Sequence, residues 1–470
     1  MTTPLTQSPR NACALRHAKE RLADTLEHRI RQAAEAGGGD AVVRAEIPIE
    51  PVEALPWLEQ IRGQRRAYWA GRDGAFEMAG VGAAEAVRVD AGAPAAECFA
   101  HIASRIRAAG GRVRYYGGLR FDPEMTPAGP WDALGQGQFI LPRFEIVNGP
   151  SGCALAANAV LGPKDDPRRV LAVALMELGA LPLEVPEAAS QHWGAPARLD
   201  TPDREAWSAM VRAGLDAMRR EETTKIVLAR QSRFQFGAPP DPAALLRRLV
   251  SRTQDSYHFC FDEPGGPAFI GASPERLYKR SERRLESEAL AGTRPRGTTA
   301  AEDEALGQVL LASGKDLREH RYVADALERD FNALCDAVQA DGGVQLLKLH
   351  RCQHLIWRVE GTLRDGISDA AIVERLHPTP AVCGCPRDRA AAWIRELEGF
   401  DRGWYAGPVG WLGHGGAEFA VAIRSGLVWG RDVLLYSGAG IVDGSQPDDE
   451  WLEIENKMTT FEGCLAPGHE

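Results

Sequence analysis

The sequence predicts an α+β fold built around a large antiparallel sheet. Short β-like runs follow one another over much of the chain, separated by Gly, Pro and Asp turns rather than by helices. Amphipathic helical patterns stand mostly apart from these runs, at 12–35, 201–222, 315–338 and 448–465. Strands that follow each other without helical crossovers favour antiparallel pairing, which argues against a nucleotide-binding βαβ array.

The first 200 residues are predicted to contribute two helices and a series of strands. Four apolar residues from Leu15 to Ile30 lie on one helical stripe, which predicts a helix over 12–35 that ends at the glycines of "AGGGD". A second helix is predicted near 94–109. The predicted strands of this part are 41–49, 66–82, 112–121, 137–148 and 168–178.

The rest of the chain mixes capped helices with further strands. Thr201 is predicted to cap the helix over 201–222, and Asp241 is predicted to cap another helix. The segments 256–261 and 267–273 predict a hairpin. The other predicted strands are 223–236, 346–363, 403–413, 418–430 and 432–442.

Composition is that of an ordinary globular protein. The 470 residues are 44% hydrophobic and 26% charged, with a net charge of −10. No basic tract is interleaved with aromatic residues, so we expect no nucleic-acid partner. No run approaches the length of a membrane helix, and no membrane contact is expected. The nine cysteines are scattered, and the Cys383-x-Cys385 pair lacks a second pair at zinc spacing, which favours a reducing cytoplasm.

One lysine stands in an otherwise apolar strand. The run "TTKIVLAR" (223–230) puts Lys225 on one strand face with Val227 and Ala229. Because lysine is rarely buried without a partner, this position is a candidate for chemistry.

Two of the predicted helices each carry a pair of acids. Asp316 and Glu319 are three residues apart and share one helix face. Glu450 and Glu453 repeat this spacing, and Lys457 extends their face by one turn. Two such pairs are suited to an oxygen-seeking cation such as Mg²⁺. A solvated helix surface is the alternative for either pair.

Four further features are candidates for a binding site. The glycine-rich segment 436–442 follows an apolar strand, and its N–H groups suit an anion, although a plain tight turn is the alternative. Arg424 lies in an apolar strand, where a substrate carboxylate would pair with it. His354 is either a core histidine or a pocket residue. Glu275 follows a strand directly, where it is either a turn-capping acid or a general acid with a raised pKa.

Ten segments, in order over about residues 200–465, resemble the motifs of the chorismate-utilising enzymes. They are "TTKIVLAR", "FIGASPERL", "EALAGTRPRG", "KDLREHRYV", "CQHL", "LHPTPAVCGCPR", "GWYAGPVGW", "EFAVAIRSG", "SGAGIV" and "DDEWLEIENKM". The resemblance implies the fold of anthranilate synthase component I, a large antiparallel β-sandwich core surrounded by helices. It also implies a chorismate-binding catalytic domain over 201–466, with an N-terminal strand and helix region over 1–200 packed on the same body.

The family's motifs, carried over to the matching positions, imply a role for each candidate. Lys225 is implied as the general base and Glu275 as the general acid. The implied metal site takes Mg²⁺ on Glu319 and Glu453, with Asp316 and Glu450 as outer-shell partners. The implied substrate-binding positions are His354 and Thr379 at the ring, and Tyr405, Arg424, Gly438, Ala439, Gly440 and Lys457 at the carboxylates.

Lysine at position 225 implies that water, rather than ammonia, adds to chorismate. The anthranilate branch has a non-basic residue in this motif and usually depends on a glutaminase subunit, which is not expected here. The resemblance therefore implies an isochorismate synthase of the isomerase class: Mg²⁺-dependent water addition at C2 with loss of the C4 hydroxyl. Salicylate synthase, which goes on to eliminate pyruvate, is the alternative.

Four questions arise at this level. An inactive homologue that only binds a metabolite would be expected to lack one of the base, acid or metal positions, and all of them are present. The pathway served, whether menaquinone, salicylate or a catechol siderophore, is not determined. The protein is expected to be a monomer or a homodimer. In "AVCGCP", Cys383 and Cys385 depart from the family pattern and leave the shape of that loop open.

Overall fold

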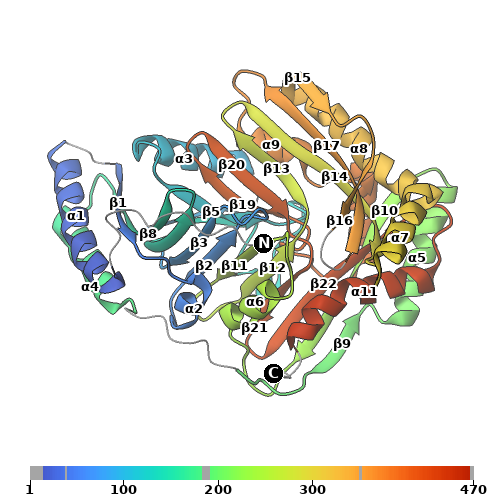
Figure 1. The fold of residues 1–470 in the computed structure, drawn as a ribbon, viewed down its shortest axis with the longest axis horizontal. Helices are drawn as coiled ribbons and strands as arrows, with labels where there is room; N and C mark the ends of the chain where they lie inside the picture. The colour runs from blue at the N-terminus through green and yellow to red at the C-terminus, as the bar shows by residue number, and fades with distance from the viewer. Residues whose placement is uncertain (1–13, 37–39, 91, 183–190, 349–351, 466–470) are drawn as a thin grey trace.

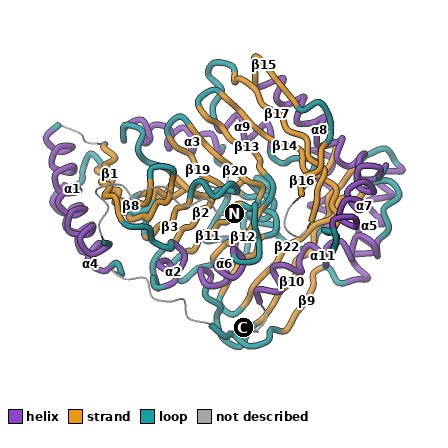
Figure 2. Tube along the Cα trace, viewed as in Figure 1, coloured by secondary structure: helices purple, strands orange, loops and turns teal. Residues whose placement is uncertain are grey.

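Two large antiparallel sheets form the centre of the protein (Figure 1). The computed structural model describes residues 14–36, 40–90, 92–182, 191–348 and 352–465. One sheet has 12 strands and the other has 10, and helices lie around them (Figure 2). The predicted α+β fold with a β-sandwich core is confirmed.

The 12-stranded sheet combines strands from both halves of the chain. Its order is β1 (Ala41–Ile49), β8 (Gly152–Leu161), β7 (Phe144–Gly149), β3 (Glu77–Val81), β2 (Arg66–Ala70), β11 (Tyr257–Asp262), β12 (Ala268–Ser273), β21 (Ser425–Trp429), β22 (Asp432–Ile441), β10 (Lys225–Gln235) and β18 (Gly384–Cys385), with β9 (Ala197–Thr201) also paired to β10. The N-terminal strands join the C-terminal ones where β2 pairs with β11.

The 10-stranded sheet is built in the same way. Its order is β15 (Cys335–Ala340), β17 (Cys352–Leu363), β14 (Arg284–Pro295), β13 (Arg276–Ser281), β20 (Gly416–Val421), β19 (Pro408–Gly413), β5 (Arg114–Leu119), β6 (Gly137–Leu141) and β4 (Glu85–Val89), with β16 (Gln345–Lys348) paired to β17. Here the two halves of the chain meet where β5 pairs with β19. A domain boundary near residue 200 therefore crosses continuous sheets, and the division at that residue stays a prediction.

The helices occupy the ends and outer faces of the sheets. They are α1 (Leu15–Glu35), α2 (Ala54–Glu59), α3 (Ala95–Ala108), α4 (Pro167–Ala180), α5 (Arg204–Arg219), α6 (Pro242–Val250), α7 (Ala300–Ala312), α8 (Gly314–Leu334), α9 (Asp369–Leu376), α10 (Arg387–Leu397) and α11 (Pro447–Leu465), with a 3₁₀ turn at Gly129–Trp131. Figure 1 shows α1 and α4 together beside β1, and α5, α7 and α11 at the opposite end. None of the helices in the described ranges is both long and apolar enough to cross a membrane.

Most of the predicted elements are present, but the strand predicted at 168–178 and the helix cap predicted at Thr201 are wrong. The segment 168–178 is not a strand but part of α4, which begins at Pro167 behind the capping carboxylate of Asp166. A continuous apolar run does not distinguish a strand from a helix, and this helix buries only a narrow stripe. Thr201 does not cap α5 because it ends β9; the cap is Asp203, whose carboxylate accepts the N–H of Ala206 at 2.9 Å.

Candidate functional site

Lys225, the first residue of β10, is fully buried and has an ionic partner. Its Nζ lies 3.1 Å from Oε1 of Glu319 on α8. The strand pairs along its length with β22, where Val227 lies opposite Gly440. The predicted strand face is therefore correct, and the partner that a buried lysine requires comes from a helix 94 residues away in the sequence.

This ion pair belongs to a cluster of three lysines and three glutamates. Lys315 on α8 lies 2.8 Å from Glu450 on α11, and Lys457 lies 2.8 Å from Glu453 one turn earlier on α11. We call these six residues the Lys–Glu cluster: Lys225, Lys315, Lys457, Glu319, Glu450 and Glu453. Its formal charges sum to zero.

Members of the Lys–Glu cluster shift one another's pKa values. Burial disfavours the ammonium form of Lys457, but the Glu453 and Glu319 carboxylates outweigh burial and raise the pKa of Lys457 above its ordinary value. Burial also opposes ionisation of Glu453, yet Lys457, Lys315 and Lys225 together lower the pKa of Glu453. Lys457 and Glu453 therefore hold each other in the ionised form.

The carboxylates of the cluster are chemically suited to Mg²⁺ but are not a preformed cage. Within the described ranges, no three His, Cys, Asp or Glu side chains converge to hold a metal ion. Asp316, expected in the outer shell, instead pairs with Arg294 at 2.6 Å. Because Mg²⁺ typically takes one or two protein carboxylates and completes its shell with water and substrate oxygens, Glu319 and Glu453 fit this requirement.

Glu275 lies between β12 and β13, and only 4% of it is exposed. Burial, reinforced by the nearby Glu288 carboxylate, raises the pKa of Glu275 to about 8, although Lys225 and Lys457 act in the opposite direction. Glu275 is therefore largely protonated at neutral pH. The influence of both lysines on this pKa links Glu275 to the Lys–Glu cluster.

A buried ion pair supports the backbone beside Glu275. Arg72, in the turn between β2 and β3, binds Glu288 through two N–H groups, one of them at 2.9 Å. The same guanidinium donates to the carbonyl of Pro274 at 2.6 Å. The N-terminal half of the chain thus contributes a contact that fixes the segment carrying Glu275.

His354 on β17 lies in a group of polar side chains. Its Nδ1 lies 2.9 Å from the hydroxyl of Thr293, and its Nε2 lies 3.2 Å from Sγ of Cys352. A nitrogen of Arg424 is 3.9 Å from the same sulfur. Burial and the Arg424 charge lower the pKa of His354 to about 3, so the imidazole is neutral at physiological pH.

Arg424 does not lie within a strand as predicted. β20 ends at Val421 and β21 begins at Ser425, and Arg424 between them has a φ of 50°. Its carbonyl accepts the N–H of Ala272 at 3.1 Å. This left-handed conformation is costly for a residue with a Cβ, and such strain concentrates at functional sites.

Gly438, Ala439 and Gly440 do not form a turn, because they lie within β22 and pair with β10. The predicted strand over 432–442 is therefore confirmed, and the interpretation of the same glycines as a turn of free N–H groups is wrong. The two glycines instead leave space for neighbouring side chains. A Cβ on Gly440 would lie 2.5 Å from Oε1 of Glu319 and 3.2 Å from Cε of Lys225. The strand thus allows the Lys225–Glu319 pair to sit directly against its backbone.

Tyr405 and Thr379 are the remaining predicted substrate-binding residues. Tyr405 stacks on Tyr436 with ring centroids 5.4 Å apart, and its hydroxyl would be 3.2 Å from a Cβ on Gly438. The carbonyl of that glycine accepts from Nζ of Lys457 at 2.9 Å. Thr379 has a buried hydroxyl for which the described residues supply no hydrogen-bond partner. Tyr405, Gly438 and Lys457 are thus brought together with the Lys–Glu cluster.

Three residues of the candidate site were not identified from the sequence: Lys315, Glu288 and Arg72. Lys315 lies four residues before Glu319, and this i, i+4 spacing was an available signal. Glu288 and Arg72 are 216 residues apart, and no local pattern indicates that they meet. Cys383 and Cys385 are free thiols.

Known proteins share both the sequence and the fold. The family described as "Chorismate binding enzyme" matches residues 28–466. Isochorismate synthase 2, chloroplastic, from Arabidopsis thaliana is 38% identical over 369 residues, which cover 75% of this chain and 64% of that protein. This chain therefore spans less than two thirds of that relative's length.

Two solved structures resemble this one. MenF, the menaquinone-specific isochorismate synthase from Escherichia coli, has a TM-score of 0.80 at 28% identity, covering 94% of this chain and 100% of that one. Anthranilate synthase component I from Streptococcus pneumoniae TIGR4 has a TM-score of 0.60 at 22% identity, covering 74% and 80% of the two chains, and shows the fold alone. With the family match over residues 28–466, the chain belongs to the chorismate binding enzyme family.

Proposed function

We propose that this protein is an isochorismate synthase, which converts chorismate to isochorismate by adding water at ring C2 as the C4 hydroxyl leaves. The observation that carries the proposal is a buried lysine and a buried, protonated glutamate beside one charge cluster. Such a pair supplies the base and the acid that the reaction needs. The likeness to the Arabidopsis and Escherichia coli isochorismate synthases supports it.

In the proposed reaction, each proton has an assigned carrier. Lys225, in its amine form, accepts a proton from the attacking water as the C2–O bond forms. The ring double bonds shift, the C4–O bond breaks, and Glu275 donates the proton that lets the hydroxyl leave as water. Tyr405, Arg424 and Lys457 bind the substrate carboxylates, and neutral His354 contacts the ring. Because water is the nucleophile, the reaction requires no glutaminase subunit.

Charge balance supports joint binding of Mg²⁺ and chorismate. With all six side chains ionised the Lys–Glu cluster is formally neutral, so by itself it does not offset the charge of a dianionic substrate. Glu319 and Glu453 would hold Mg²⁺, which would supply two compensating charges and positive potential for a substrate carboxylate. Glu453 is the more accessible of the two ligands, with 43% of its side chain exposed.

We expect Glu453→Gln to weaken Mg²⁺ binding specifically. Loss of one anionic ligand should raise the Mg²⁺ concentration for half-maximal activity by about tenfold or more, because ligand charge sets the affinity for hard cations. Calorimetric titration with Mg²⁺ in the presence of chorismate checks this directly. Glu462→Gln, on the same helix but paired with Arg198, is the matched control and should leave the titration unchanged. Equal titrations for both variants would count against the ligand role.

Chromatography of the products tests the function itself. The protein is incubated with chorismate and Mg²⁺, and the products are resolved over time. Isochorismate alone is the expected result. Salicylate with pyruvate would support the salicylate synthase alternative, which the same lysine allows. Anthranilate formed with added ammonia, or no product, would contradict the proposal.

A further inference from the structure

The edge of β10 next to Lys225 has a gap that side chains fill. On this edge β18 pairs with residues 225–226 and β9 pairs with residues 231–235. Among the described strands, none pairs with the residues between them on this side. Side chains provide partners for two of the backbone groups on this edge. The carbonyl of Val227 accepts from Nη2 of Arg402 at 2.7 Å, and the N–H of Ala229 donates to Oε1 of Glu398 at 2.7 Å.

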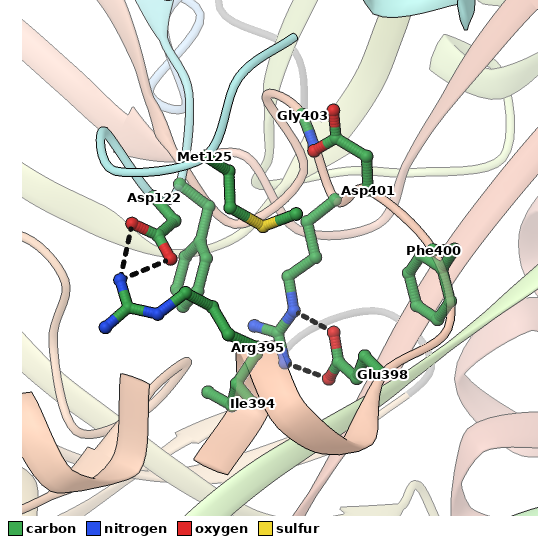
Figure 3. Close-up of a pocket in the computed structure, with 10 residues that line it drawn as sticks. Asp122, Met125, Ile394, Arg395, Glu398, Phe400, Asp401 and Gly403 are labelled. Atoms are coloured by element: carbon green, nitrogen blue, oxygen red, sulfur yellow. Dashed lines mark hydrogen bonds and ion pairs between the residues drawn. The ribbon is translucent and has the colours of Figure 1, made fainter. Parts of the chain in front are cut away.

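The two side chains that fill this gap form a buried ion pair. Glu398 and Arg402 are 2% and 4% exposed, and the guanidinium binds the carboxylate through two N–H groups, one of them at 2.7 Å. Figure 3 shows Glu398 in this pair, beside the loop that carries Asp401 and Gly403. A bidentate arginine–carboxylate pair has a fixed geometry, so it can act as a rigid substitute for a strand.

Through its guanidinium, which also lies 5.8 Å from the ring centroid of Tyr405, Arg402 contacts two further segments that carry proposed substrate contacts. Its Nη1 donates to the carbonyl of Val382 at 3.0 Å, in the loop that follows Thr379. The carbonyl of Arg402 accepts the N–H of Tyr405 at 2.9 Å, which closes the turn behind that tyrosine. One buried pair is thus in contact with three segments that bear on the site.

We propose that the Glu398–Arg402 pair is a positioning device for the reaction, which fixes the strand of Lys225 relative to the Thr379 loop and to Tyr405. The proposal rests on the proposed function. Neither side chain is assigned any contact with substrate. Its effect comes through the backbone, because Val227 is two residues from Lys225 in the same strand. A misplacement of about 1 Å in a catalytic group can cost about 10²-fold in rate.

Arg402→Lys is the first test, because lysine keeps the charge but lacks the planar fork. We expect kcat to fall by about tenfold or more, with KM for chorismate changed less than about threefold. The fall should be equal at every pH, because no titrating group of the reaction is altered. The matched control is Arg44→Lys, which disturbs another buried arginine in contact with Glu145 and Asn158 on the remote β1–β8–β7 edge. It should lower thermal stability but leave kcat per folded molecule unchanged.

A second variant covers the case in which Arg402→Lys does not fold. Glu398→Gln combined with Arg402→Gln removes both charges together and leaves no unpaired buried charge. It should fold and show the same loss of kcat. Wild-type kcat in either variant would overturn the proposal, as would a change confined to KM. If neither variant folds, the pair is structural and the proposal fails. The kcat of each variant is compared with that of the wild type for the product that the wild type forms. If the wild type forms no isochorismate, the proposed function fails, whatever the variants show.

Discussion

Lys225→Ala is expected to lower kcat by between about 10²- and 10⁴-fold, the range that a positioned general base contributes. KM for chorismate should change little, because the carboxylate contacts proposed for Arg424, Tyr405 and Lys457 remain. Glu319, left without its 3.1 Å partner, still interacts with Lys315 and Lys457, so the Lys–Glu cluster should stay intact. Steady-state kinetics with chorismate, together with thermal unfolding to confirm the fold, measure this effect.

Lys225→Arg separates base catalysis from simple charge balance. Arginine keeps a positive charge beside Glu319 but does not give up its proton in proteins. If Lys225 is the base, the arginine variant should be as inactive as the alanine variant while keeping more of the thermal stability. Recovery of more than about a tenth of the wild-type kcat by arginine would show that the ion pair, and not proton transfer, is what the reaction needs.

Glu275→Gln is the second large effect, with an expected fall in kcat of about 10²-fold or more and little change in KM. The pH profile gives the sharper signature. Because burial raises the pKa of Glu275 to about 8, the wild type should lose kcat as pH rises through about 8 and the acid ionises. The glutamine variant has no proton to lose at this position, so its residual activity should lack that alkaline limb. A limb that persists in this variant would assign the ionisation to another group.

Glu288→Gln is the matched control for this interpretation. The Glu288 carboxylate helps to raise the pKa of Glu275, and it also neutralises Arg72. Its removal therefore lowers the pKa of Glu275 in two ways, and the alkaline limb should move to lower pH while activity below it is largely kept. His354 should not contribute an acidic limb between pH 5 and 7, because burial lowers its pKa to about 3.

The raised pKa of Glu275 also has a consequence for stability. The carboxyl group binds its proton more tightly in the folded protein than at the ordinary value of 4.5. The stability from this proton is therefore fully present below pH 4.5 and is lost as pH rises through about 8. Stability against urea, measured at several pH values in wild type and in Glu275→Gln, should show this dependence only in the wild type.

Local sequence patterns were sufficient to predict many of the helices and strands of this protein. Spacing and capping residues identified α1, α6, α8 and α11 closely, and the β11–β12 hairpin. They failed at α4, where an apolar run allowed both helix and strand. They left both a strand and a glycine turn open at Gly438–Gly440, which are strand positions opposite β10. In both cases the decision came from what packs against the segment, which the segment itself does not contain.

By itself the sequence determined the fold class and the identities of the candidate residues, because motif order and residue type are properties of the chain. Only the tertiary structure decided their partners. It paired Lys225 with Glu319, brought Lys315 to Glu450, and surrounded Glu275 with apolar burial and one neighbouring carboxylate. Ionisation in a protein interior depends on the charges and the solvent within a few ångströms, and these neighbours come from residues far apart in the sequence.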